Sequence, residues 1–263
     1  MTGTHFDLSG RTALVVGGAG VIGRTVAAAL ATLGAQVTIA DLATADSAAC
    51  AAALPPVAGG SHRGLDVDCA SVSSMQEFCG SFADEQLDIF VHCVGLTSHV
   101  ALPGYAAPWE EQSTEAWQQS MAVNLDSAFV LSQGLREALL RSPHGSMIFV
   151  SSIYGSVAPQ WSLYDGTGMG NPIAYGVAKA GMNQLVRYLA TLYAPTVRVN
   201  GLAPGGLQRH QAEAFQTRYC DRTPLGRMAT PDDLIGPVQF LASDAAQYVT
   251  GQILTVDGGF SLI

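Results

Sequence analysis

The chain has 263 residues, of which 48% are hydrophobic and 13% charged, so we expect a packed globular core and not disorder. Its formal net charge of −9 argues against nucleic acid and anionic membrane surfaces as partners, because both attract basic proteins. No apolar run approaches the length of a membrane span, and the N-terminus lacks the basic start of a signal peptide. Five scattered cysteines without a CxxC pair suggest neither disulfides nor a metal site, so we expect a metal-free cytoplasmic protein.

Strand and helix patterns alternate along the chain. Strands are predicted at Arg11–Gly17, Gln36–Asp41, Ser61–Asp66, Leu87–Cys93, Ser146–Ser151, Val197–Gly201 and Ile253–Val256. Helices are predicted at Ala19–Gly34, Ala45–Leu54, Ser71–Asp84, Ser113–Arg141, Ile173–Tyr193 and Pro231–Leu241. This alternation predicts an α/β fold in one domain over residues 1–263, with a Rossmann-like doubly wound parallel sheet of about seven strands and helices on both faces.

A glycine-rich turn, with Gly17, Gly20 and Gly23, separates the first predicted strand from the first helix. Such a turn lets backbone N–H groups at a helix N-terminus meet a pyrophosphate, although an ordinary tight turn needs glycine as well. Asp41 ends the second strand about 20 residues further on, where a carboxylate accepts hydrogen bonds from adenosine ribose hydroxyls. The same carboxylate would repel the extra phosphate of NADP, so NAD(H) is the expected cofactor.

Tyr175 and Lys179 lie four positions apart in a predicted helix, so both side chains are expected on one helix face. Lys179 is the only lysine in the chain. An ammonium about 5 Å from a phenol, at an effective dielectric of ~20, would lower the tyrosine pKa from ~10 towards ~8. A pKa in that range suits general acid/base catalysis near neutral pH. The YxxxK spacing is common, however, and chance can also leave a single lysine.

Further motifs follow one pattern when they are taken with the glycine turn and the YxxxK pair. They are Asp66-Val67, His92-Cys93-Val94-Gly95, Asn124 in MAVNLDSAF, Ser152 in FVSSIYG, Asn200–Gly205, Thr223-Pro-Leu-Gly-Arg and Val256-Asp-Gly-Gly. Over nearly its whole length the chain resembles the compact, single-domain branch of the short-chain dehydrogenase/reductase family.

The resemblance implies roles for four catalytic residues. Tyr175 would exchange a proton with the substrate, and Ser152 would orient the reacting oxygen. Lys179 would lower the pKa of Tyr175 and hold the nicotinamide ribose, and Asn124 would hold a water in a proton relay. The adjacent Ser151 is the alternative to Ser152, because successive side chains at a strand end point to opposite faces.

The resemblance also implies a cofactor site, with residues 1–145 mainly binding cofactor and residues 146–263 supplying catalytic and substrate groups. The expected cofactor-binding residues are Gly17, Gly20, Val21, Ile22, Gly23, Asp41, Asp66, Val67, Cys93, Val94, Gly95, Tyr175, Lys179, Pro204, Gly205, Gly206 and Leu207. Three positions depart from the family pattern. Val16 replaces a threonine, Val21 replaces a glycine so that the spacing becomes GxxGxxG, and His92 replaces an asparagine. We expect His92 to be structural.

Two loops, Thr97–Pro108 and Ile153–Pro172, are longer than a compact family member needs. The second resembles a loop of family members associated with bacterial sugar modification, and its aromatic and hydroxyl groups suit a polyhydroxylated ring. The expected substrate residues are Tyr154, Trp161, Tyr164 and Arg209. Arg209 belongs to a group with Gln208, His210 and Arg218 that could meet a carboxylate or phosphate. A subunit contact or an ordinary lid is the alternative use of these loops.

The sequence therefore predicts an NAD(H)-dependent oxidoreductase that interconverts a secondary alcohol and a ketone on a small sugar-like or cyclitol-like substrate. Three alternatives stay open. They are a 3-oxoacyl or other small-ketone reductase, an epimerase or dehydratase that retains its NAD, and a dinucleotide sensor without activity. A homotetramer or homodimer is expected, built through helices 113–141 and 173–193 and the last strand.

Overall fold

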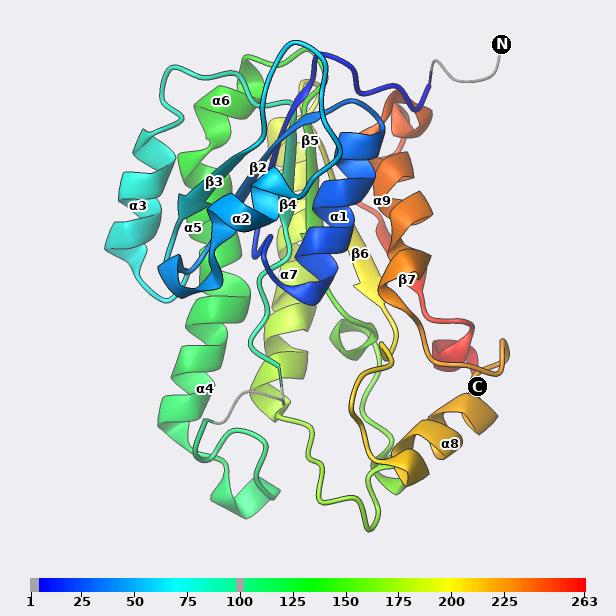
Figure 1. Cartoon of the computed structure of the whole chain (residues 1–263). Coiled ribbons are helices and arrows are strands. Elements are labelled where there is room, and N and C mark those ends of the chain that lie inside the picture. Colours follow the sequence, from blue (N-terminus) through cyan, green and yellow to red (C-terminus); the bar gives the residue numbers. More distant parts are fainter. Residues whose placement is uncertain (1–4, 98–101) are drawn as a thin grey trace.

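Seven parallel strands form one central sheet (Figure 1). The computed structural model describes residues 5–97 and 102–263. The strands are β1 Thr12–Val16, β2 Gln36–Asp41, β3 Arg63–Asp66, β4 Ile89–His92, β5 Ser146–Val150, β6 Arg198–Pro204 and β7 Ile253–Val256. They lie in the order β3-β2-β1-β4-β5-β6-β7, which confirms the predicted doubly wound α/β fold.

Helices cover both faces of this sheet (Figure 1). They are α1 Val21–Thr32, α2 Ser47–Ala52, α3 Val72–Gly80, α4 Thr114–Met121, α5 Ser127–Gly134, α6 Arg136–Leu140, α7 Ile173–Tyr193, α8 Glu213–Arg222 and α9 Ile235–Ala242. Along β1, Ala13 and Val15 pack with α1, α2 and α9, whereas Leu14 and Val16 pack with α3, α5, α6 and α7. This alternation follows from the two-residue period of a strand, and it buries β1 on both sides.

The chain reverses its direction of winding between β1 and β4. From β1 it runs outward to β2 and β3 and then returns to β4, which pairs with the opposite side of β1. The carboxyl ends of these two strands lie side by side, since Val16 is in register with His92. Ligands bind at such a switch point in open α/β sheets, because the loops diverge there and leave a crevice.

The predicted secondary structure differs from the observed one in two places. The helix expected over 113–141 forms from Thr114 to Leu140, but a π-helical turn at Ala122–Asp126 and a turn at Leu135 separate it into α4, α5 and α6. Helix α8 was not predicted. No helix in the described residues is long and apolar enough to cross a membrane.

Candidate active site

The glycine turn forms one wall of a hollow at the switch point. We name it the inner hollow; its volume is about 170 Å³, and it is lined by Gly17, Gly20, Val21, Ile22, Gly23, Cys93, Val94, Gly95, Thr97, Val150, Ser151, Tyr175, Lys179 and Arg209. Ten of the residues expected to bind cofactor are therefore brought together.

Close backbone packing explains the glycines of this turn. A Cβ on Gly17 would lie 2.8 Å from the backbone after β4, and Gly17 also has a φ of +74°. A Cβ on Gly23 would lie 2.6 Å from the Cα of Gly18. Gly20, the N-cap of α1, has no side chain to accept the first-turn N–H groups. The helix N-terminus therefore opens into the hollow with donors available to an anion, and the cradle fits a dinucleotide pyrophosphate.

Asp41 lies at the carboxyl end of β2, beside this turn. Its Oδ2 accepts a hydrogen bond from the backbone N–H of Ala19 at 3.0 Å, and its Oδ1 accepts one from Leu42 at 2.9 Å. The two bonds hold the carboxylate against the glycine turn and leave each oxygen a further lone pair for a hydroxyl donor. Asp66 is in register with Asp41 at the end of β3, and Val67 donates from its backbone N–H to the Asp41 carbonyl at 2.8 Å.

The segment that follows β4 is held from two sides. Lys179 Nζ donates to the Val94 carbonyl at 3.3 Å. The Asn124 side chain accepts from the Leu96 backbone N–H at 2.9 Å and donates to the Leu96 carbonyl at 3.2 Å. Asn124 is fully buried in the π-helical turn, so its amide joins this turn to the segment after β4, of which Val94 and Gly95 line the inner hollow.

Lys179 and Tyr175 share one face of α7, as the spacing predicts, with Nζ 5.8 Å from the centre of the tyrosine ring. Only 2% of Lys179 is exposed, and Nζ also donates to the Val150 carbonyl at 2.8 Å. Burial lowers the pKa of Lys179 to about 8. The ammonium is thus directed at carbonyls of β5 and of the segment after β4.

The expected lowering of the tyrosine pKa is wrong for this structure. Burial raises the pKa of Tyr175 above its ordinary value, and the hydrogen bond with Ser152 and the charge of Arg209 only partly offset this. The reason is tertiary. Lys179 contacts carbonyl oxygens, whereas the phenol is desolvated by the loops around it.

The structure separates the two neighbouring serines. Ser151 Oγ donates to the Asn183 side chain at 2.6 Å and is buried against α7. Ser152 Oγ accepts from the backbone N–H of Tyr154 at 3.2 Å, and Ser152 lines the outer hollow together with Tyr175. Ser151 also lines this hollow, but its hydroxyl proton is donated to Asn183, which favours Ser152 as the serine that orients a substrate oxygen.

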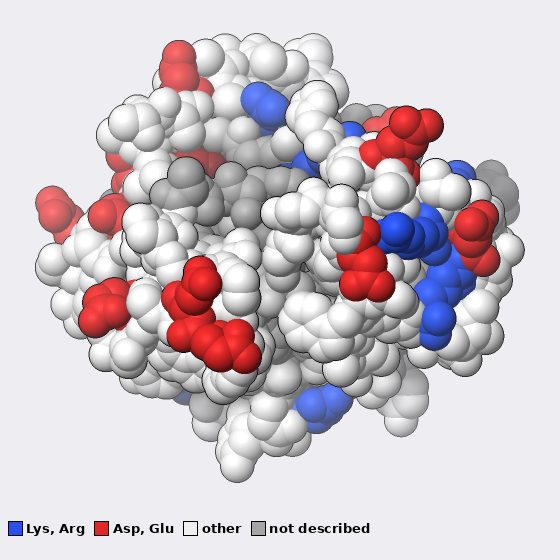
Figure 2. All heavy atoms as spheres, turned by 90° about the horizontal axis from the view of Figure 1, so that it is seen from below, with Lys and Arg blue, Asp and Glu red and all other residues white. Residues whose placement is uncertain are grey.

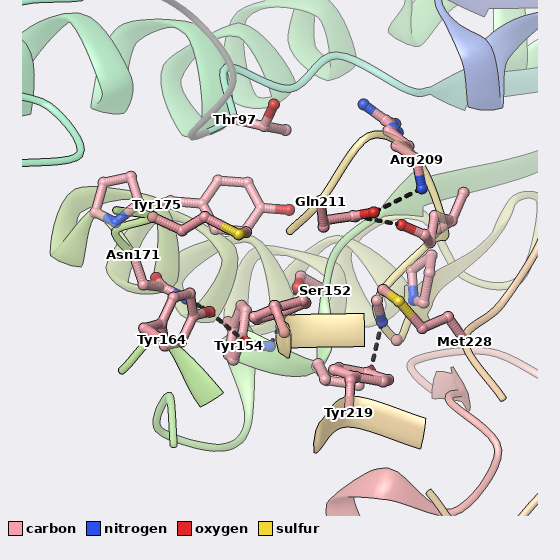
Figure 3. A pocket seen from close by; sticks show the side chains of 18 of the residues that line it. Thr97, Ser152, Tyr154, Tyr164, Asn171, Tyr175, Arg209, Gln211, Tyr219 and Met228 are labelled. Atoms are coloured by element: carbon pink, nitrogen blue, oxygen red, sulfur yellow. Dashed lines mark hydrogen bonds between the residues drawn. The ribbon is translucent and has the colours of Figure 1, made fainter. Parts of the chain in front are cut away.

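A second hollow of about 170 Å³ adjoins the first, and we name it the outer hollow. Among the residues that line it are Ser152, Tyr154, Tyr164, Met169, Asn171, Tyr175, Pro204, Gly205, Gly206, Leu207, Arg209, Gln211, Phe215, Tyr219 and Met228. Figure 3 shows the Tyr175 hydroxyl pointing towards its middle, with Thr97 and Arg209 on one side and Ser152 and Tyr154 on the other. Tyr175 and Arg209 belong to both hollows.

The lining of the outer hollow is both polar and apolar. The hydroxyls of Tyr154 and Tyr164 are 2.9 Å apart, and Asn171 Nδ2 donates to Tyr164 Oη at 2.9 Å. Phe215 and Met228 belong to a buried apolar cluster against which both tyrosines pack, and the rings of Tyr164 and Phe215 lie 5.3 Å apart. Sequence reasoning missed the wall from α8, although Phe215 and Tyr219 have the four-residue spacing of a helix face, which was a usable signal.

Two residues expected near the substrate lie elsewhere. Trp161 is 57% exposed and is not among the residues that line the outer hollow; its ring lies 6.0 Å from that of Tyr164. Arg218 Nη1 donates to the carbonyls of Leu163 at 3.3 Å and Asp165 at 2.6 Å, so it holds the long loop. Both positions depend on how α8 docks on that loop.

His92 is buried in the sheet, as expected of a structural residue. Its Nε2 lies 2.9 Å from Ser127 Oγ, and Ser127 Oγ in turn donates to the Val123 carbonyl at 2.7 Å. Because the Ser127 hydroxyl proton is used in that bond, Ser127 Oγ can only accept from His92. The proton of the neutral imidazole is therefore on Nε2. Burial and the charge of Lys179 lower the pKa of His92 to about 3.

Comparison with known proteins agrees with this geometry. A family model described as "Enoyl-(Acyl carrier protein) reductase" matches residues 17–261. A tropinone reductase homolog of Arabidopsis thaliana is 34% identical, over 99% of this chain and 96% of its own length. The chain belongs to the short-chain dehydrogenase/reductase family. The resemblance inferred from the motifs is thus confirmed.

Relatives within this short-chain dehydrogenase/reductase family differ in substrate. The D-threitol dehydrogenase of Mycolicibacterium smegmatis is 31% identical, over 98% of this chain and 95% of its own length. The 3-oxoacyl-[acyl-carrier-protein] reductase FabG of Escherichia coli is 29% identical, over 98% of this chain and 100% of its own length. Both are oxidoreductases by name, so the family fixes the class of reaction more firmly than the substrate.

Solved structures of the family differ in cofactor. A gluconate 5-dehydrogenase from Burkholderia cenocepacia, in complex with NADP and tartrate, has a TM-score of 0.87 at 28% identity, over 100% of both chains. A short-chain dehydrogenase from Leptospira borgpetersenii with bound NAD+ has a TM-score of 0.80 at 30% identity, over 97% of this chain and 94% of its own. Members of this family use a nicotinamide cofactor, and the choice between NAD and NADP depends on the residues of each chain.

Proposed function

We propose that this short-chain dehydrogenase/reductase interconverts a secondary alcohol and a ketone on a small, polar, sugar-like or cyclitol-like substrate, with NAD(H) as cofactor. One observation carries the proposal: the Tyr175 side chain lines both hollows. A proton-exchanging group at that junction can act on a substrate in the outer hollow while the cofactor occupies the inner one.

The nicotinamide, when bound, accepts or supplies the hydride, and the protein residues handle the proton and the geometry. Tyr175 takes the hydroxyl proton during oxidation and returns one during reduction. Ser152, which lines the outer hollow together with Tyr175, orients the substrate oxygen. Lys179 would hold the nicotinamide ribose, and Asn124 would keep the segment after β4 in place while protons pass to solvent.

The raised pKa of Tyr175 favours one direction at neutral pH. Because burial disfavours the ionised phenol, the side chain is a proton donor there, as ketone reduction requires. Alcohol oxidation requires the ionised form, so its rate should increase with pH whereas the reduction rate should not. Equal pH profiles in the two directions would contradict this assignment.

Asp41 supports NAD(H) over NADP(H). Its carboxylate is held beside the glycine turn, where an additional ribose phosphate would meet a negative charge. The residues that follow it, Leu42, Ala43 and Thr44, offer no cation to receive that phosphate.

The polarity of the outer hollow supports a polyol. The hydroxyls of Tyr154 and Tyr164 and the amide of Asn171 offer hydrogen bonds to substrate oxygens, and the aromatic faces suit its C–H groups. The relative named for D-threitol makes such a substrate plausible by analogy; the FabG relative keeps a 3-oxoacyl or other small ketone as the second candidate.

The decisive experiment is a screen of polyols, cyclitols, their ketones and 3-oxoacyl thioesters, with NADH absorbance as the readout. Tyr175→Phe should reduce turnover to below about one per cent and leave the dissociation constant of NADH nearly unchanged, because the variant keeps the ring that lines the inner hollow and loses only the hydroxyl that exchanges the proton. If the variant kept more than a few per cent of activity, Tyr175 would not be the proton-exchanging group.

The proposal includes an oligomeric protein in the cytoplasm. Exposed apolar side chains on the outer helices, among them Trp117, Phe129, Tyr188 and Leu192, support a homotetramer, or a homodimer, built through α4, α5 and α7. All five cysteines are free, as a reducing cytoplasm would maintain them.

A further inference from the structure

The two hollows have an unusual charge for a protein of net charge −9. Lys179 in the inner hollow and Arg209 in both are the charged residues of their linings, and among the described residues no aspartate or glutamate joins them there. Figure 2 shows the molecule from below, with acidic side chains spread over this face. A local excess of positive charge on an acidic protein attracts an anionic ligand.

Arg209 differs from the other arginines of the C-terminal quarter. Arg218 donates to loop carbonyls, Arg222 donates to the Ile263 carbonyl, and Arg227 forms a two-pronged ion pair with Asp233. Within residues 5–97 and 102–263, no carboxylate lies within 4.0 Å of the Arg209 guanidinium, although the residue is half-buried. A guanidinium removed from water in part, with no carboxylate partner among the described residues, is suited to a ligand oxygen pair.

The backbone that carries Arg209 is held in place. Its N–H donates to Gln211 Oε1 at 2.7 Å, and Gln211 Nε2 donates to the Leu207 carbonyl at 2.7 Å (Figure 3). The Gln208 backbone N–H also donates to the Ala229 carbonyl at 2.8 Å. The loop is therefore ordered before a ligand arrives, so binding costs little conformational entropy.

Arg209 also lies near the reacting group. It lines both hollows together with Tyr175, and its positive charge acts on the Tyr175 phenol. A ligand anion on Arg209 would therefore sit close to the carbon whose oxygen meets Tyr175.

We propose that Arg209 binds a carboxylate of the substrate and selects hydroxy acids or keto acids, such as four- to six-carbon aldonates, over neutral polyols. This inference rests on the proposed function. A phosphate of the cofactor has the same chemistry, but it already has the glycine cradle and the N-terminus of α1, whereas Arg209 is the cation of the outer hollow.

The test compares matched ligands that differ in one group. Four-, five- and six-carbon aldonates are each paired with the alditol that has CH₂OH in place of the carboxylate. Binding to the NADH-loaded protein is measured by calorimetry, and turnover by NADH absorbance. The variants are Arg209→Ala and Arg209→Lys, with Arg187→Gln, an exposed arginine of α7, as the charge-matched control.

At least one aldonate should bind more tightly than its alditol to the unmodified protein. Arg209→Ala should raise the dissociation constant of that aldonate about 10- to 100-fold, in line with the loss of a charged hydrogen bond. It should change the dissociation constant of the alditol less than about threefold. Arg209→Lys should recover only part of the loss, because it lacks the planar fork. The control and the dissociation constant of NADH should not change.

Two results would overturn the inference. One is that no aldonate binds better than its alditol. The other is that Arg209→Ala weakens NADH and affects both members of a pair equally, which would assign the residue to a cofactor phosphate. Failure of the proposed function gives a different result, namely calorimetric binding of aldonates without any NADH-linked turnover.

Discussion

Removing the amine of Lys179 should leave the cofactor-free protein at least as stable as before, although it abolishes activity. The residue is 2% exposed, and burial lowers its pKa from 10.5 to about 8. Keeping the ammonium charged at pH 7 therefore costs about 3 kcal/mol of folding free energy. In Lys179→Met that cost disappears.

Two hydrogen bonds are lost in the same variant. Nζ donates to the Val94 and Val150 carbonyls, and such bonds contribute about 0.5–1.5 kcal/mol each. The difference predicts that the free energy of unfolding of Lys179→Met at pH 7 equals that of the unmodified protein or exceeds it by up to about 2 kcal/mol. Turnover should be lost, since nothing replaces the charge beside the inner hollow.

The pH dependence has a definite sign. Between pH 8 and 10.5 the unfolded chain binds the lysine proton more strongly than the folded one does, so the unmodified protein gains stability relative to Lys179→Met as the pH rises through this range. Urea unfolding followed by circular dichroism at pH 7 and pH 10 measures the difference. Arg24→Met removes the same charge from an exposed site on α1, outside the proposed subunit interface, and should change stability by less than about 0.5 kcal/mol.

The single lysine makes a direct measurement possible. Incorporation of ¹³C-labelled lysine yields one side-chain resonance, whose titration reports the pKa of Lys179 alone. A midpoint near 8 in the cofactor-free protein is expected. A midpoint at 10 or above, or a Lys179→Met protein that is less stable than the unmodified one by more than about 1 kcal/mol at pH 7, would refute the reasoning.

Three other predictions concern the cofactor and the assembly. Asp41→Ala should raise the dissociation constant of NADH about tenfold and leave that of NADPH nearly unchanged, as measured by fluorescence titration, because a ribose acceptor is lost and no phosphate partner is gained; equal affinities of the unmodified protein for NADH and NADPH would contradict the role of Asp41. Gly23→Ala should raise the dissociation constant of NADH more than tenfold, since its methyl group would lie 2.6 Å from the backbone of the preceding turn. Gly80→Ala, whose methyl group would have nothing within 4 Å, should bind NADH as the unmodified protein does. Tyr188→Glu combined with Leu192→Glu should convert the expected tetramer into smaller species in light scattering, because the two side chains are 68% and 71% exposed on α7; a monomeric mass for the parent at micromolar concentration would rule that interface out.

The residue pattern along the chain was sufficient to predict the strands, the shared helix face of Tyr175 and Lys179, and the glycine turn. All seven strands were predicted within a few positions. The central strands β1, β4 and β5 are buried apolar runs that need little context, whereas the edge strands β3 and β7 are only partly buried. The spacing of Tyr175 and Lys179 placed both on one helix face, and the glycine spacing predicted a backbone cradle. Both spacings lie within stretches of fewer than ten residues, so they can be recognised without the tertiary structure.

Long-range contacts decided the rest, since their energies depend on residues that the pattern does not bring together. The predicted helix over 113–141 is interrupted where Asn124 bonds to Leu96, 28 positions earlier. The sign of the Tyr175 pKa shift follows from burial by several loops, which outweighs a lysine four residues away. The wall of the outer hollow exists only because α8 docks on the long loop, where Arg218 holds the Asp165 carbonyl from 53 positions away. Solvent exclusion and such distant hydrogen bonds are properties of the packed chain, so they become visible only when the chain is folded.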